Sequence, residues 1–183
     1  MKISILFVAL AVSACPVGAE ESDAGLPAMN YASSVASQEL LDIIKTHAAF
    51  RNLDKELVGS PITLRITHTL QPTAGGKAAG ALSAVLAGGT LGLLPVVTKN
   101  SLIVSYEVLV HGEPVASYEY QKGFTRAINI WANQNDPTYG LGQEGLDWVK
   151  STAGEFTIAA AKDSKLLELK KEYDFYFSGP PAH

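Results

Sequence analysis

Three stretches of the chain alternate between hydrophobic and polar residues with the two-residue period of a half-buried β-strand. In residues 61–70, isoleucine and leucine alternate with threonine and arginine. Residues 102–110 and 115–121 alternate in the same way, and the turn-forming residues 111–114 lie between them. We therefore expect one strand over 61–70 and an antiparallel hairpin over 102–121.

Two other stretches repeat their hydrophobic residues every three or four positions, as an amphipathic helix does. Ser37 is a favourable N-cap and Glu39 lies in the first turn, so we expect a helix from Ser37 to within 51–57. A second helix is expected over 143–161. Its apolar face comprises Leu146, Val149, Ala153, Phe156 and Ala160.

The stretch 165–177 fits either period, because its leucines and aromatic residues alternate with charged ones. The alternation favours a closing strand at its aromatic end, directly or after a helical extension. Together these elements predict one α+β domain over 34–178. In it, a small antiparallel sheet of three to four strands packs against two helices.

Residues 78–98 contain no charge, and small residues recur every four positions at Gly80, Ala84, Gly88 and Gly92. That spacing allows close packing of membrane helices, and 21 residues would just span a bilayer. Glycine and alanine contribute little to membrane insertion, however. We expect a segment buried inside the domain. A membrane-apposed hairpin or helix, and a spanning or oligomerising helix, remain as alternatives.

The N-terminus has the pattern of an export signal, because Lys2 precedes an apolar run over 3–12. The tetrapeptide Val12-Ser13-Ala14-Cys15 that follows resembles a bacterial lipobox, and Cys15 is the only cysteine of the chain. The resemblance implies a signal peptide over 1–14 and lipid attachment at Cys15. The small and polar residues that follow favour a flexible tether, so that 15–33 comprises the lipidated cysteine and the tether. Acyl chains on Cys15 would hold the protein on a membrane without a spanning helix.

The resemblance also implies the outer membrane, with the domain facing the periplasm, because position 16 is a proline and not an acidic residue. Cleavage after Ala19 by an ordinary signal peptidase is the alternative, and it would give a soluble periplasmic or secreted protein. A third alternative is an uncleaved anchor, which is disfavoured because the apolar run is too short to span a bilayer.

The charge and the cysteine content narrow the range of possible functions further. Without residues 1–14 the chain has 13 Lys and Arg against 18 Asp and Glu, a net charge of −5. This balance argues against nucleic acid as a partner, since nucleic-acid binding requires clustered basic residues. The domain beyond Cys15 has no cysteine, so it has neither a disulfide nor a thiolate metal ligand.

No sequence motif of an enzyme is complete. Gly75-Gly76-Lys77 lacks the rest of a phosphate-binding loop, because positions 71 and 78 are glutamine and alanine. Glu144 and Asp147 resemble paired carboxylates but are better explained as acids in the first turn of a helix. We predict no catalytic residue, no cofactor and no metal. The histidines are scattered along the chain, at His47, His68, His111 and His183.

Four aromatic residues can be interpreted in two ways. They could line a groove for a glycan or peptide, or contribute to the core and the sheet face, which we favour. They are Tyr118, Tyr120, Trp131 and Tyr139.

A second resemblance covers roughly residues 80–121. Thr90-Leu91-Gly92-Leu93-Leu94-Pro95, followed by the hairpin ending in Tyr118-Glu119-Tyr120, is similar to small uncharacterised Gram-negative envelope lipoproteins. It implies a location and a fold but no activity. We expect a non-enzymatic envelope lipoprotein that binds a protein partner and is held on the membrane by its acyl chains. The alternatives are an auxiliary lipoprotein of an envelope transporter and an enzyme acting on the cell wall or a glycan.

Overall fold

The computed structural model describes residues 25–35, 37–89, 96–128 and 140–177. Five strands form one sheet in the order β2-β1-β3-β4-β5. The strands are β1 (Met29–Ser33), β2 (Leu53–Asp54), β3 (Ile62–Pro72), β4 (Val96–Val110) and β5 (Glu113–Ile128). The helices are α1 (Gln38–Lys45), the 3₁₀ turn η1 (Ala48–Phe50), α2 (Ala74–Gly89), α3 (Gly142–Ala160) and α4 (Ser164–Phe177).

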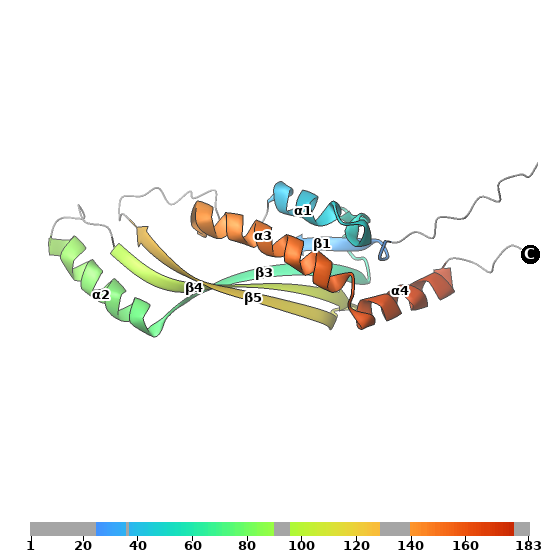
Figure 1. Ribbon diagram of the computed structural model, residues 1–183. Helices are drawn as coiled ribbons and strands as arrows, with labels where there is room; N and C mark the ends of the chain where they lie inside the picture. Colours follow the sequence, from blue (N-terminus) through green and yellow to red (C-terminus); the bar gives the residue numbers. More distant parts are fainter. Residues whose placement is uncertain (1–24, 36, 90–95, 129–139, 178–183) are drawn as a thin grey trace, which may run out of the picture.

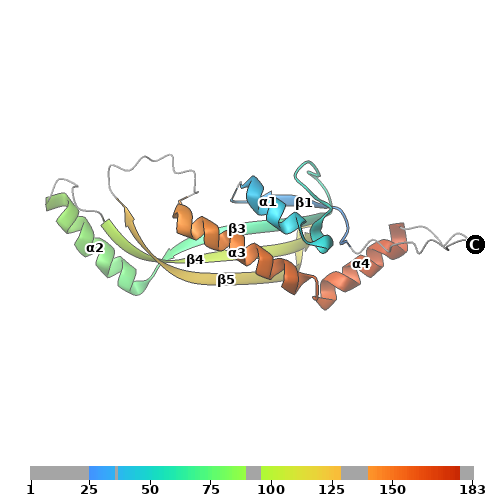
Figure 2. The same ribbon diagram turned by 45° about the horizontal axis from the view of Figure 1, so that its top comes forward.

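The strands β3, β4 and β5 are antiparallel, whereas β1 lies parallel to both β2 and β3. Helices α1 and α3 cover one face of this sheet (Figure 1). Helices α2 and α4 lie at opposite ends of the elongated molecule, and the rotated view in Figure 2 shows the same arrangement. One end of the molecule therefore carries α2, and the other end carries α4.

The alternation predicted for 61–70 and for the hairpin is confirmed. Leu64 of β3 pairs with Val108 of β4, and both side chains are buried beneath the helices. Both hairpin strands are longer than predicted and pair from Val96 with Ile128 to Val110 with Glu113. The opposite face of the sheet is polar, and there Arg65 and Glu107 form an ion pair with a nitrogen–oxygen distance of 2.7 Å.

An aromatic stack joins α3 to the sheet at the centre of the core. The rings of Tyr106 and Phe156 are stacked, with centroids 4.6 Å apart and an interplanar angle of 10°. The Tyr106 hydroxyl donates a hydrogen bond to the carbonyl oxygen of Val149 at 3.1 Å and lies 2.9 Å from Thr152 Oγ1. Phe50 packs on the other side of Phe156, with centroids 5.1 Å apart. The stack thus connects η1, α3 and β4.

The first predicted helix begins where the sequence indicated but ends early. Ser37 is its N-cap, and its hydroxyl accepts a hydrogen bond from the backbone N–H of Leu40 at 3.3 Å. The helix ends at Lys45 because His47 starts the separate turn η1 by accepting a hydrogen bond from the N–H of Ala49. The second predicted helix is confirmed as α3.

The predicted sheet of three to four antiparallel strands packed against two helices was wrong in detail, because the sheet has five strands, is mixed, and is accompanied by four α-helices. One of the additional strands, β1, lies inside the predicted tether over 15–33. Leu26 and Met29 are buried in the core, and the N–H of Leu26 donates to the carbonyl oxygen of Ala49 at 2.8 Å. Residues 25–33 therefore belong to the domain. Cys15 and the predicted signal peptide lie outside the described residues.

The closing strand predicted at the aromatic end of 165–177 is a helix, α4. Leu166, Leu169 and Tyr173 follow the three-or-four-residue spacing of a helix, and all three contact the core. Lys170 and Asp174 add an ion pair across one turn, at 2.6 Å. Of the charged residues that produced the apparent alternation, Glu168 and Glu172 are exposed, whereas Lys170 and Asp174 are partly buried and line a cavity with residues 25–28.

The described helical part of the uncharged segment 78–98 is not buried inside the domain as predicted. This part extends to Gly89, and Leu82 and Val85 are 66% and 73% exposed. Residues 90–95, which include Gly92 and the apolar motif of the resemblance to envelope lipoproteins, lie outside the described residues. Among the helices of the described ranges, none combines the length and the apolar character needed to cross a membrane.

Asp163 connects β5 to the first turn of α4. Its carboxylate accepts hydrogen bonds from the Tyr118 hydroxyl at 2.6 Å and from the N–H of Lys165 at 2.9 Å. The bond from Tyr118 is the main reason why the pKa of Asp163 lies below its ordinary value. The charged carboxylate is therefore the form that stabilises the fold.

We expect Asp163→Ala to lower the free energy of unfolding by about 1 kcal/mol at neutral pH, the usual cost of losing an N-cap. The lowered pKa means that this contribution is present above the ordinary aspartate pKa of about 3.9 and is lost as the pH falls through the folded-state value. Urea denaturation at neutral and acidic pH measures both effects. Asp163→Asn is the control, because asparagine keeps the cap without the charge. A difference from wild type that does not shrink in acid would contradict the assignment.

Candidate functional site

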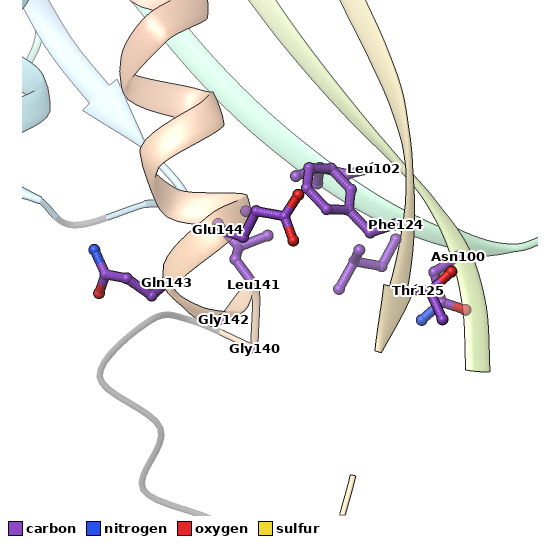
Figure 3. A pocket seen from close by; sticks show the side chains of 11 residues that line it. Asn100, Leu102, Phe124, Thr125, Gly140, Leu141, Gly142, Gln143 and Glu144 are labelled. Carbon is purple, nitrogen blue, oxygen red and sulfur yellow. The ribbon is translucent and has the colours of Figure 1, made fainter. Parts of the chain in front are cut away.

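A small apolar cavity lies where the ends of β4 and β5 meet the start of α3 (Figure 3). Its volume is about 130 Å³, and Leu70, Leu102, Phe124 and Leu141 provide most of its hydrophobic wall. Gly140 and Gly142 have φ angles of +75° and +70°, which let the chain turn into α3 around the buried Leu141. Ligand sites for organic molecules measure about 300–1,000 Å³, so this cavity is too small for one.

The charged groups around this cavity stay at its rim. Glu144 lines it, but the Glu144 side chain is largely exposed and lies 3.9 Å from the Lys122 ammonium group. Lys122 in turn lies 5.0 Å above the ring of Phe124, a cation–π contact. Asp147 accepts a hydrogen bond from Gln143 and lies 3.8 Å from Lys150. Glu144 therefore lies in the first turn of α3, as expected, and both carboxylates have surface partners.

The structure gives each described histidine a different local environment. His47 caps η1, His68 Nδ1 lies 2.7 Å from the Ser34 hydroxyl, and His111 occupies the β4–β5 turn with φ +52°. His183 lies outside the described residues. Within 25–35, 37–89, 96–128 and 140–177, no three His, Cys, Asp or Glu side chains are grouped so that they could hold a metal ion.

The two described members of the aromatic set pack against the core, as expected. Tyr118 meets the ring of Phe156 edge-on at 5.3 Å, and Tyr120 meets Tyr106 edge-on at 5.9 Å. Burial raises the pKa of both Tyr118 and Tyr120. Trp131 and Tyr139 lie outside the described residues.

The surface of α2 carries the first exposed apolar group. Thr73 fixes the start of this helix on β4, because its N–H and its hydroxyl both donate to the carbonyl oxygen of Lys99 at 3.1 Å. Leu82, Val85 and Leu86 follow at positions that share one helix face, and all three are more than half exposed. We call Leu82 and Val85 the α2 apolar face. Lys77 is the only charged residue of the helix.

The C-terminal end of α4 carries the second exposed apolar group. Phe175, Tyr176 and Phe177 are 80%, 74% and 72% exposed, and we call them the terminal aromatic group. Sequence reasoning missed it, because a strand would have buried every second residue of this stretch. Helical spacing from Leu166 to Tyr173 was the signal that could have found it.

The described residues thus define an α+β domain with one helix-covered sheet face and an exposed apolar group at each end. No protein-family model matches the chain, and no curated protein matches it. Several solved structures are similar to it, including two lipoproteins. Rare lipoprotein B from Shewanella oneidensis is 15% identical, with a TM-score of 0.26, and the match covers 82% of this chain and 98% of that one. An uncharacterized lipoprotein B from Nitrosomonas europaea is 13% identical, with a TM-score of 0.26, and the match covers 86% and 90%. These values define no family for the chain.

Proposed function

We propose that the chain is a non-enzymatic lipoprotein that binds a protein partner at the periplasmic face of the outer membrane. The α2 apolar face is the observation that carries this proposal. Leu82 and Val85 project from a nearly uncharged helix at one end of the molecule (Figure 1). An auxiliary role in an envelope transporter is one form of the same function, in which the transporter is the partner.

The free energy of burying apolar side chains favours a partner that covers the α2 apolar face. Removing one leucine or valine side chain from water contributes about 1.5–3 kcal/mol, and exposed apolar residues grouped on one surface typically mark an interaction site. The 130 Å³ cavity, by contrast, is smaller than a typical ligand site. The exposed side chains of α2 therefore support recognition through this helix.

A photo-crosslinking amino acid at Val85, in the full chain expressed in its native envelope, tests this proposal. We expect one discrete protein adduct from position 85. The matched control is Val58, an apolar residue that is 84% exposed in the β2–β3 loop and lies outside α2. Leu82→Ser should abolish the adduct at position 85 without changing the fold. Adducts of equal yield from both positions, or adducts with lipid alone, would contradict a protein partner at α2.

The proposed anchor makes a separate prediction at Cys15. Cys15→Ser removes the thiol that would carry the acyl chains, so we expect lower membrane retention and a signal that remains unprocessed at the lipobox. Stable anchoring needs more than one acyl chain, which a di- or triacylated cysteine provides. Intact mass of the wild-type protein measures this directly. A mature N-terminus at Glu20 with no acyl chain would show that the soluble alternative is correct.

A further inference from the structure

We infer that the terminal aromatic group, Phe175, Tyr176 and Phe177, contacts the headgroup region of a phospholipid membrane beside the lipid anchor. This inference deepens the proposed function and rests on it, because it assumes attachment at Cys15. The group would form a second contact between the domain and the membrane. That contact would fix the orientation of the domain, which a flexible lipid tether alone leaves free.

The exposure of the group is the first observation. Three consecutive aromatic residues are each more than 70% exposed, although one such side chain can bury about 150–250 Å². The rings of Phe175 and Tyr176 pack edge to face, with centroids 5.1 Å apart, and Phe177 packs against Tyr173 at 4.7 Å. Tryptophan and tyrosine are enriched at the boundary between lipid and water, where the ring lies among the headgroups, and phenylalanine occurs on the buried face of helices that lie at this boundary.

The place where the chain enters the domain is the second observation. Residues 25–28 line a cavity together with Lys170, Tyr173 and Asp174 of α4. Nine residues lie between Cys15 and Gly25, and the ten steps from one to the other reach at most about 35 Å in an extended chain. The strand β4 alone has 15 residues, which correspond to about 50 Å. The tether therefore ends beside α4, and α2 lies at the far end of the sheet (Figure 2).

The charge of α4 specifies the chemistry of the surface. Its three lysines are balanced by two glutamates and one aspartate, so neither an anionic nor a cationic surface is favoured. Burial of the aromatic rings must then provide the attraction to the membrane. A zwitterionic phospholipid surface allows this burial and carries no net charge. Ionic strength should have little effect on this contact, unlike the binding of a basic segment to anionic lipid.

Fluorescence quenching by brominated phospholipid, with the full lipidated chain in phosphatidylcholine vesicles, tests the inference. We compare Phe175→Trp with Leu82→Trp, a matched change at an exposed site on α2, and subtract the signal of Trp131 and Trp148. The added tryptophan at position 175 should lose most of its fluorescence at low and at high ionic strength, and the one at position 82 should not. Equal quenching at both positions, or none at 175, would overturn the inference.

Retention in cells provides a second readout that does not depend on a new tryptophan. In the Cys15→Ser chain, residual membrane association should persist and should be lost when Phe175→Ser, Tyr176→Ser and Phe177→Ser are added. Leu82→Ser and Val85→Ser should leave it unchanged. If intact mass shows no acyl chain on Cys15, the proposed anchor fails, but quenching at position 175 still decides the aromatic contact. Cross-linking of position 175 to a protein instead of lipid would assign this end to a protein partner.

Discussion

Phe156→Ala is expected to lower the free energy of unfolding by about 3–5 kcal/mol, the usual cost of removing a buried aromatic side chain. Phe156 is fully buried and is the one residue of α3 that contacts both Phe50 and Tyr106 through ring packing. Its removal leaves a cavity between the helix layer and the sheet. It also removes the ring that positions the Tyr106 hydroxyl against the backbone of α3.

Urea or guanidinium denaturation, followed by circular dichroism, measures this loss. Ile158→Ala is the matched control, because Ile158 lies two residues further along α3 and is 55% exposed. We expect the control to cost much less, because an exposed side chain leaves no cavity when it is shortened. Equal losses from the two variants would mean that α3 does not pack on the sheet through Phe156.

The local patterns in the sequence predicted the elements whose own periodicity shows which face is buried. The alternation in 61–70 and in the hairpin is confirmed because the two-residue period of a strand marks its buried face whichever strand it pairs with. The helix α3 is confirmed in the same way, since its buried apolar residues recur every three or four positions from Val149 to Ala160. Ser37 was identified as an N-cap because a capping hydroxyl acts within three residues.

The elements that were missed depend on contacts between distant parts of the chain. Residues 29–33 form a strand because they pair in parallel with β3, and only two buried side chains of β1, Met29 and Tyr31, mark this in the sequence. In α2, the glycines lowered the apparent helix propensity. Its exposed leucine and valine residues then indicated burial, although the helix presents them to the surface.

The candidate surfaces were less predictable than the fold. Composition argued against nucleic-acid binding, and the lipobox resemblance predicted the anchor at Cys15. Neither indicated that exposed apolar groups lie at opposite ends of the molecule, because that separation results from the length of the β3–β5 strands. A membrane contact at the α4 end would leave α2 directed away from the lipid, toward the proposed partner.

The second large effect is expected at the N-terminal boundary of the domain, where Met29→Ala should cost about 2–5 kcal/mol. Met29 is 1% exposed, and its N–H donates to the carbonyl oxygen of Asn52 in the segment that leads into β2. Because β1 lies between β2 and β3, a cavity at Met29 loosens both of these strands. A flexible tether, by contrast, would tolerate alanine at this position.

Chemical denaturation of the full chain separates the two interpretations of residues 25–33. Val58→Ala is the control, since it also shortens a hydrophobic side chain but at a site that is 84% exposed. A large loss for Met29→Ala and a small one for Val58→Ala would place the start of the domain near Leu26, whose own side chain is buried. Unchanged stability of Met29→Ala would return these residues to the tether. The tether would then be longer, and its length would no longer keep the α4 end nearer to the anchor than the α2 end.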